Sequence, residues 1–172
     1  MAKVAFIMDE MFEDSEFRVP FERVKEAGHE PVVIGLKAGK DLAGKKGKVR
    51  VTTDAAISDV DPSEFDALVI PGGYSPDKIR VEPKMAEFTR QFDAEGKPIA
   101  AICHAGWMLA EANLIKGRTV TSWPSIKTDL INAGANWVDQ EVVEDGNIIT
   151  SRKPDDLEAF TKTLLAQIEQ RT

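Results

Sequence analysis

Cys103 is the only cysteine of the chain, and its neighbours place it at an unusual point in the predicted structure. The apolar segment 98–102 has strand character and ends directly before this cysteine, His104 follows, and residues 107–110 read as helix. A thiol at a helix N-terminus lies near the positive end of the helix dipole, which favours the thiolate. We therefore interpret Cys103 as a reactive cysteine in a nucleophile elbow, the alternative being a buried core cysteine.

Other groups follow strand-like segments and are candidates for the same site. Glu13 comes after the first segment, Gly72 and Gly73 come after the third, and His104 comes after the central one. In an open parallel sheet, ligands bind outside the carboxyl ends of the strands. We therefore expect these groups to converge in one crevice, although they are widely separated in sequence.

Each candidate has a chemical role and a structural alternative. The backbone N–H of Gly73 can stabilise a developing oxyanion, whereas a tight turn would explain the glycine structurally. Glu13 is either a catalytic carboxyl group or a charge that complements a helix N-terminus. Adjacent side chains normally diverge, so His104 contributes either its imidazole or only its backbone N–H. One cysteine and one nearby histidine fall short of a metal-ligand set, so we expect no metal and no cofactor.

The elements that must position these groups alternate along the chain. Helices are predicted at 15–27, 83–94, 125–133 and 154–170. Strands are predicted at 3–8, 31–36, 65–70, 98–102 and 118–122, with a hairpin at 39–53 and two short strands within 141–150. This alternation predicts a three-layer α/β/α sandwich with a mostly parallel, flavodoxin-like sheet. We interpret the lysines of the hairpin as a solvated face.

The composition is that of one globular domain spanning residues 1–172. A net charge of −7 argues against a general nucleic-acid or anionic-membrane binder. A single cysteine cannot form an internal disulfide, so the fold needs no oxidising compartment. The sequence starts without a basic leader, and no run reaches the roughly 18 apolar residues of a membrane span. These features predict a cytoplasmic protein.

Five segments of the chain resemble a known family, and they lie at 10–16, 65–77, 101–104, 131–135 and 150–157. Together they resemble the PfpI/ThiJ family, within the glutamine-amidotransferase-like fold group, over nearly the whole chain. The resemblance implies that Cys103 is the nucleophile, that Glu13 hydrogen-bonds it, and that the Gly73 and His104 amides are oxyanion donors. It also implies a homodimer or larger homo-oligomer in which Asp77 from a neighbouring subunit reaches the histidine.

The chain departs from the family in one place. Relatives usually have Gly-Pro after Cys-His, whereas Ala105 and Gly106 follow here. The proline that would preset the first helical turn is absent, so we expect a different elbow and pocket shape. We expect Trp123 and Gly72 to line the pocket, while Trp107 either narrows it or packs into the core.

The resemblance implies a stress-protective cysteine hydrolase that acts on a small carbonyl compound or a modified protein or peptide. Relatives are described as intracellular peptidases and as deglycases that remove methylglyoxal or glyoxal adducts. We favour deglycase- or glyoxalase-like chemistry, in which Cys103 attacks a carbonyl carbon. The alternative is non-catalytic: a redox sensor that oxidises Cys103, with Glu13 stabilising the oxidised form. A stress holdase ranks last, because nothing in the sequence marks an exposed apolar surface.

Overall fold

A seven-stranded sheet forms the centre of the computed structural model, which describes residues 1–171 and leaves Thr172 outside the described residues. The strand order is β10-β11-β7-β6-β1-β2-β5, and only the β10–β11 pair is antiparallel. The strands are β1 (Lys3–Ile7), β2 (Glu30–Gly35), β5 (Ala55–Ala56), β6 (Ala67–Ile70), β7 (Ile99–Ile102), β10 (Val143–Asp145) and β11 (Ile148–Ser151). The predicted mostly parallel sheet is confirmed.

The apolar runs of the central strands explain their place in the middle of the molecule. Every residue of β6, β7 and β11 is buried, as is typical of parallel strands covered by helices on both faces. Successive side chains along these strands point to opposite faces of the sheet. They therefore belong to two separate hydrophobic clusters, one on each face.

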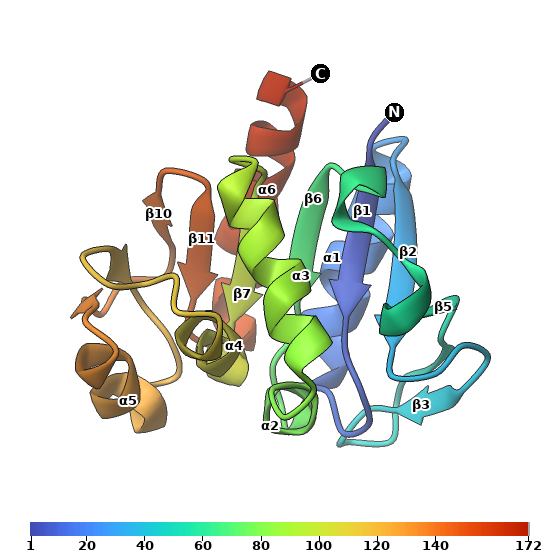
Figure 1. The fold of residues 1–172 in the computed structure, drawn as a ribbon, viewed down its shortest axis with the longest axis horizontal. Coiled ribbons are helices and arrows are strands. Elements are labelled where there is room, and N and C mark those ends of the chain that lie inside the picture. The colour runs from blue at the N-terminus through green and yellow to red at the C-terminus, as the bar shows by residue number, and fades with distance from the viewer. Residues whose placement is uncertain (172) are drawn as a thin grey trace.

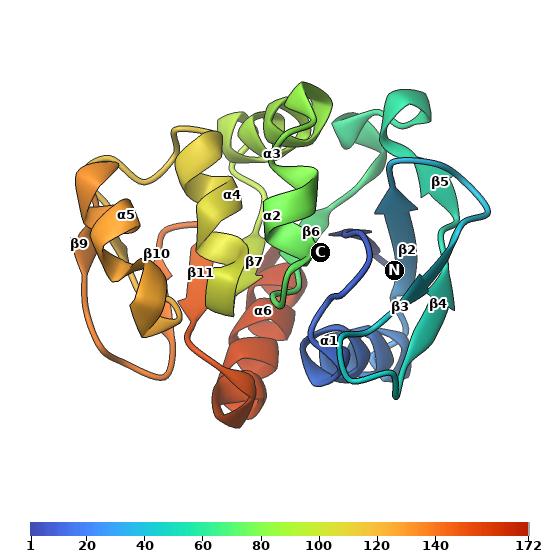
Figure 2. The same ribbon diagram turned by 90° about the horizontal axis from the view of Figure 1, so that it is seen from below.

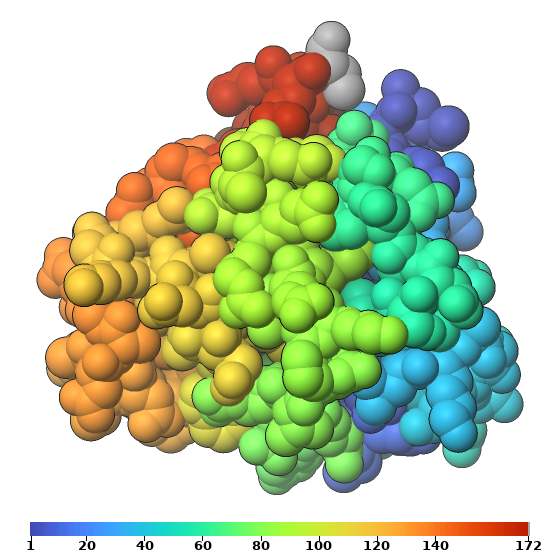
Figure 3. All heavy atoms as spheres, viewed as in Figure 1, coloured from blue at the N-terminus to red at the C-terminus, as the bar shows by residue number. Residues whose placement is uncertain are grey.

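Helices cover the two faces and complete the predicted sandwich. Figure 2 shows α1 (Asp14–Glu26) and α6 (Leu157–Arg171) on one side, with α2 (Ser75–Ile79), α3 (Pro83–Ala94) and α4 (Gly106–Glu111) on the other. The apolar face predicted for the C-terminal helix is buried in the core and consists of Leu157, Phe160, Leu164 and Ile168. In the space-filling view, side chains of α3 and its neighbouring segments cover the sheet (Figure 3).

Smaller elements differ from the sequence expectation in detail. The predicted hairpin is present as β3 (Asp41–Ala43) and β4 (Arg50–Thr52). The strand predicted at 118–122 is short and outside the main sheet: β8 (Thr119–Val120) pairs in parallel with β9 (Asn136–Trp137). The helix expected at 125–133 is a 3-10 turn, Pro124–Ile126, followed by α5 (Lys127–Asn132).

The order of the strands defines where a site can form. The chain leaves β1 toward β2 and later returns to β6 on the other side of β1, so strand order reverses between β1 and β6. Such a switch point opens a crevice at the carboxyl ends of the strands, the end that Figure 2 faces. The start of β1 and the end of α6 lie at the opposite end of the sheet (Figure 1). No helix within residues 1–171 is long and apolar enough to span a membrane.

Candidate active site

Cys103 occupies a sharp turn between β7 and α4. Its φ of 63° is in the left-handed region, which is rare for a residue other than glycine and marks local strain. A 3-10 turn, Cys103–Ala105, continues from it into α4, so the predicted strand–cysteine–helix elbow is present. The thiol Sγ lies 3.2 Å from Nδ1 of His104, so in this turn the two adjacent side chains meet rather than diverge.

Backbone amides converge on the sulfur. The N–H groups of Gly73 and His104 both donate hydrogen bonds to Cys103. Gly73, the last residue of the Pro-Gly-Gly sequence that follows β6, has a φ of 84° and forms an isolated bridge with Phe12. The two amides expected as oxyanion donors therefore lie together at the thiol, where they can also hold negative charge on a bound oxygen.

The carboxyl group beside Cys103 belongs to Glu16 rather than to Glu13. The Gly72 N–H donates to Oε1 of Glu16 at 3.0 Å. A Cβ at position 72 would lie 2.4 Å from that oxygen and 2.7 Å from Cβ of Cys103, so only glycine fits between them. Burial, followed by the nearby charge of Glu13, raises the pKa of Glu16 to about 8. Glu16 therefore keeps its proton at neutral pH, as a buried carboxyl group without a full counter-charge does.

Glu13 caps the helix that carries Glu16. Its carboxylate accepts hydrogen bonds from the backbone N–H groups of Ser15 and Glu16 and from the Ser15 hydroxyl, and it pairs with Lys46 Nζ at 3.1 Å. Burial raises its pKa, but these hydrogen bonds outweigh burial and leave the pKa below its ordinary value. The hydrogen bond expected between Glu13 and Cys103 is replaced by this capping arrangement. A charge that complements the helix N-terminus was the structural alternative that the sequence offered for Glu13.

The thiol of Cys103 is harder to ionise than the helix-dipole argument predicts. Burial, followed by the charge of an ionised Glu16, raises its pKa to about 12, against lowering contributions from the Gly73 and His104 amides and from Lys45. The helix that follows has only six residues and does not compensate for burial. A protonated Glu16 exerts no charge repulsion, so proton occupancy at Glu16 controls how readily Cys103 becomes a thiolate.

The lysines of the β3–β4 hairpin are exposed, as predicted, and two of them also border the site, which the sequence interpretation did not include. Lys45 and Lys46 line the cavity above Cys103, and Lys45 Nζ lies 5.8 Å from the centre of the Tyr74 ring. The buried carboxylate of Asp14 anchors their loop by accepting backbone N–H groups of residues 46, 48 and 49 at 2.9 Å. Burial and Lys45 together lower the pKa of His104, so the imidazole is held neutral.

These groups enclose a cavity of about 270 Å³ at the carboxyl end of the sheet. Its walls are Glu13, Glu16, Lys45, Lys46, Cys103, His104, Trp123 and Pro154. Trp123 is therefore a pocket wall, as expected, and remains 39% exposed. Gly72 is buried between Glu16 and Cys103 and does not line the cavity. Asp77 lies exposed on α2, outside this cavity, and its expected contact with the histidine of a neighbouring subunit stays a prediction.

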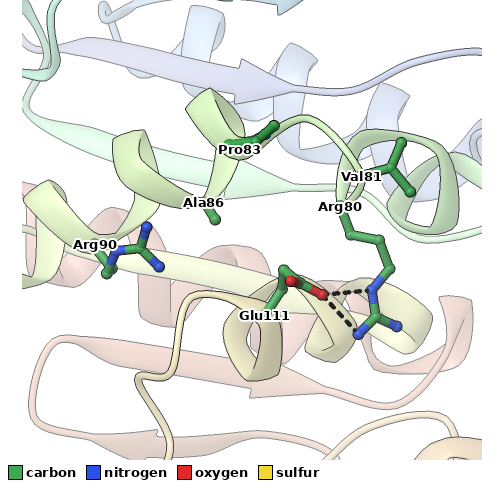
Figure 4. A pocket seen from close by; sticks show the side chains of 6 residues that line it. All are labelled: Arg80, Val81, Pro83, Ala86, Arg90 and Glu111. Atoms are coloured by element: carbon green, nitrogen blue, oxygen red, sulfur yellow. Dashed lines mark hydrogen bonds and ion pairs between the residues drawn. The ribbon is translucent and has the colours of Figure 1, made fainter.

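Trp107 was expected either to narrow the pocket or to pack into the core, and its position lies between these two alternatives. It is half-buried, and its ring meets that of His104 nearly edge to face, with centroids 5.1 Å apart. The Arg80 guanidinium lies 5.4 Å from the centre of the Trp107 ring, and Arg80 also lines a second hollow of about 420 Å³ formed by residues of the α2–α3 connection, α3 and α4 (Figure 4). That hollow is larger, but none of its lining residues is a nucleophile. Within residues 1–171, no group of histidine, cysteine, aspartate and glutamate side chains is suited to a metal ion.

Comparison with known proteins identifies the family of the chain. The model of the DJ-1/PfpI family matches residues 2–167. The chain belongs to the DJ-1/PfpI family. The resemblance found in the sequence is thereby confirmed over nearly the whole chain, and so is the α/β sandwich that it implied.

Relatives in the DJ-1/PfpI family include named bacterial proteins. The chain is 48% identical over 164 residues to Protein/nucleic acid deglycase 2 of Escherichia coli, covering 95% of each chain. It is 46% identical over 169 residues to General stress protein 18 of Bacillus subtilis, covering 98% of each. A solved two-domain structure from Anabaena variabilis, with DJ-1/ThiJ/PfpI-like and ferritin-like domains, aligns with a TM-score of 0.97 and 40% identity. The alignment covers 98% of this chain and 48% of that one.

Proposed function

We propose that this protein is a cytoplasmic, stress-protective hydrolase that uses Cys103 to act on small 2-oxoaldehydes such as methylglyoxal or on their protein adducts. The observation that carries the proposal is the 3.2 Å approach of Cys103 Sγ to His104 Nδ1 inside a small cavity that also holds a protonated carboxyl group. The names of the Escherichia coli and Bacillus subtilis relatives, a deglycase and a general stress protein, support it.

Cys103 starts the reaction by adding to the aldehyde carbon. The S–H bond breaks and its proton passes to Nδ1 of His104, while a new bond forms between the sulfur and the carbon. The carbonyl oxygen gains negative charge as its π bond opens. It is stabilised by the N–H groups of Gly73 and His104, which already point toward the sulfur in the resting site.

Glu16 is suited to move the protons that follow. A carboxyl group with a pKa of about 8 gives up and takes back a proton near neutral pH, whereas an ordinary glutamate stays ionised. For methylglyoxal, the proton on the aldehyde carbon moves to the neighbouring ketone carbon, and water then displaces the sulfur to release lactate. One carbon is oxidised as the other is reduced, so the reaction consumes only water and needs no external oxidant.

The size of the cavity favours small carbonyl groups over polypeptides. At about 270 Å³ it lies slightly below the range of about 300–1,000 Å³ that is usual for drug-sized ligands. It holds a three-carbon aldehyde, or the tip of a modified side chain that enters from a protein surface. A peptidase, the activity inherited with the family, would need subsites for several residues along the cavity.

We also propose that the protein works as a homodimer or larger homo-oligomer. Asp77 is exposed on α2, on the same side of the sheet as the elbow, and its resemblance-based role is to reach His104 of a neighbouring subunit. In that arrangement the carboxylate would complete the site across an interface, and isolated protomers would have low activity.

The decisive experiment follows methylglyoxal loss and lactate formation over time, with wild type and Cys103→Ala side by side. A second substrate is a pre-formed methylglyoxal adduct on a peptide, with free aldehyde scavenged during the reaction. Turnover of both substrates by the wild type, lost in Cys103→Ala, supports a hydrolase that repairs adducts. Turnover of free aldehyde alone restricts the activity to a glyoxalase. Absence of Cys103-dependent turnover on either substrate refutes the proposal and favours a redox sensor.

A further inference from the structure

The carboxylate of Asp14 binds the backbone of the loop at 44–49, which carries Lys45. Its two oxygens accept three backbone N–H groups, each at 2.9 Å, from Lys46, Lys48 and Val49. Asp14 is only 4% exposed and does not line the cavity around Cys103. We propose that Asp14 is a positioning residue that holds the positive charge of Lys45 beside the Cys103 thiol, where it stabilises the sulfur as the proton leaves. The inference rests on the proposed function, in which Cys103 is the nucleophile.

The direction of these hydrogen bonds is fixed by the groups that make them. A backbone N–H can only donate, and an ionised carboxylate can only accept. Burial raises the pKa of Asp14, but the hydrogen bonds from the loop outweigh burial and leave the pKa below its ordinary value. Asp14 is therefore ionised at neutral pH, and three charge-assisted hydrogen bonds tie the loop to the start of α1.

Gly44 shows how closely the loop is built around this carboxylate. A Cβ at position 44 would overlap the carboxyl group of Asp14, 2.6 Å from its Oδ1. The Gly44 N–H donates to the carbonyl of Val49, and the Gly47 N–H donates to the carbonyl of Gly44, both at 2.9 Å. The loop therefore closes on itself around the buried carboxylate, and its backbone is fixed relative to α1.

Lys45 lies in this fixed loop, and its charge acts on the two groups that exchange the proton. Its backbone N–H donates to the carbonyl of Phe12 at 2.8 Å, and its side chain lines the cavity together with Cys103 and His104. Burial has the largest effect on both groups, raising the pKa of Cys103 and lowering that of His104, while Lys45 lowers both. A cation at this position thus favours the thiolate and keeps the imidazole free to take the proton.

The other ionisable groups of the cavity do not hold the loop in the same way. Lys46 Nζ pairs with Glu13 Oε1 at 3.1 Å, but the Lys46 side chain is 55% exposed, and exposed ion pairs of this kind add little order. Within residues 1–171, Glu16 and His104 form no hydrogen bond with the backbone of the loop. The three bonds to Asp14 are therefore the main tether from α1 to the loop.

The sign of the expected effect separates positioning from a direct electrostatic role. Asp14→Asn removes a negative charge, which by itself would make the Cys103 thiol easier to ionise. Loss of the tether acts in the opposite direction, because an amide NH₂ group donates and cannot accept all three N–H groups, so Lys45 is no longer held beside the thiol. We expect Asp14→Asn to slow the alkylation of Cys103 by iodoacetamide at pH 7 about 2- to 5-fold.

The test follows the pH dependence of Cys103 alkylation in a double-mutant cycle on the full-length protein. The four proteins are wild type, Asp14→Asn, Lys45→Met and the double variant. Asp14→Asn should shift the alkylation profile to higher pH only where Lys45 is present. The matched control is Asp66→Asn, because the Asp66 carboxylate also accepts a backbone N–H, that of Lys3 at 2.8 Å, but does so at the opposite end of the sheet. Asp66→Asn should leave the profile unchanged.

Gly44→Ala tests the same contact from the side of the loop and keeps the charges of both Asp14 and Lys45. Its methyl group would push the loop off the carboxylate, so alkylation should again slow about 2- to 5-fold. The φ of Gly44 is not in the left-handed region, so its backbone accepts alanine. Urea unfolding checks that each variant is folded, and Gly44→Ala carries the test if Asp14→Asn does not fold.

Two outcomes would overturn the inference. Alkylation of folded Asp14→Asn that is as fast as wild type, or faster, would show that the carboxylate does not position Lys45. Equal slowing by Asp14→Asn with and without Lys45 would show that Asp14 acts on the thiol by another route. Alkylation requires no turnover, so the proposed function is judged separately. Methylglyoxal turnover retained by Cys103→Ala would remove the proposed function, whatever the alkylation profiles show.

Discussion

The Gly72 amide donates to Glu16 Oε1 at 3.0 Å and thereby holds a buried carboxyl group against the thiol of Cys103. Two glutamates three residues apart at the start of α1, Glu13 as its N-cap and Glu16 within it, thus have opposite charge states. Glu13 is ionised at the helix N-terminus, where backbone N–H groups and Lys46 stabilise its charge, and Glu16 is protonated one turn further into the protein. A proton is therefore held beside the thiol of Cys103 at neutral pH.

Glu16 should make the stability of the protein fall as pH rises. Its pKa is raised from 4.5 to about 8 on folding, so the folded protein binds this proton more tightly than the unfolded chain. The resulting stability is full below about pH 4.5 and is lost as pH rises through about 8. We expect wild type to lose on the order of 3 kcal/mol between about pH 5 and pH 9 by urea unfolding. Glu16→Gln should flatten this slope.

A matched control for Glu16→Gln is available on the same helix. Glu22→Gln removes an exposed carboxylate from α1 and should leave the slope unchanged. Equal slopes for Glu16→Gln and wild type would mean that Glu16 is ionised in the folded protein. Glu13→Gln should behave differently from both. Because the pKa of Glu13 is lowered on folding, its contribution is present above about pH 4.5, and the variant should lose about 1 kcal/mol at pH 7.

The strained backbone of Cys103 predicts an unusual order of stability among its variants. Its φ of 63° suits glycine and disfavours every residue with a Cβ. Cys103→Gly should therefore be about 1 kcal/mol more stable than Cys103→Ala in urea unfolding, although both abolish turnover. The neighbouring Ala105, with a helical φ of −62°, serves as the control, and Ala105→Gly should be destabilising by roughly 0.5–1 kcal/mol. A more stable Cys103→Ala would show that the elbow is relaxed.

The positive charge of Lys45 should lower the pKa of the Cys103 thiol through space. It lowers the pKa of both Cys103 and His104, so Lys45→Met should raise both values. At pH 7 we expect roughly 2- to 5-fold slower alkylation of Cys103, and a difference that shrinks at high salt because the charge is partly exposed. Lys48→Met is the comparison, since Lys48 lies in the same loop and does not line the cavity. If Lys48→Met slows the alkylation of Cys103 equally, the effect comes from the overall positive charge of the loop rather than from the position of Lys45.

A site shared between subunits predicts rescue on mixing. Asp77→Ala protomers keep Cys103 and His104, whereas Cys103→Ala protomers keep Asp77. If Asp77 acts across an interface, each variant should be inactive alone, and refolding the two together should regenerate some functional sites and measurable methylglyoxal turnover. Full activity of Asp77→Ala by itself would show that the site of each subunit is complete without Asp77 of its neighbour. Sedimentation velocity on each variant checks that the assembly is unchanged.

Periodicity and turn residues were sufficient to predict most of the fold. Apolar strands that end at Asp9, Pro71 and Cys103 indicated where the carboxyl ends of a parallel sheet would lie, and the helix at 83–94 was predicted with the bounds observed. The elements that were missed or displaced are short: β5, β9 and α2 have two to five residues, too few for a periodic pattern. Their conformation depends on tertiary contacts.

The site was predicted less completely because burial decides the role of each carboxylate. Glu13 and Glu16 look alike in sequence, and the signal that could have separated them is their spacing. A residue at the start of a helix caps it, while one three residues on points along the same side toward the interior. The hairpin lysines are exposed as predicted, but the position of Lys45 and Lys46 beside the cavity was missed for a similar reason. Only the buried Asp14 carboxylate, bonded to the backbone of their loop, turns them toward the cavity.

The separation between chain ends and cavity has a practical consequence. The first strand starts and the last helix finishes at one end of the sheet, while β7, which ends directly before Cys103, points to the other (Figure 1). A purification tag, a fluorescent protein or a surface anchor joined to either terminus would extend away from the cavity mouth. The protein can thus be immobilised or fused without obstructing the mouth of the cavity.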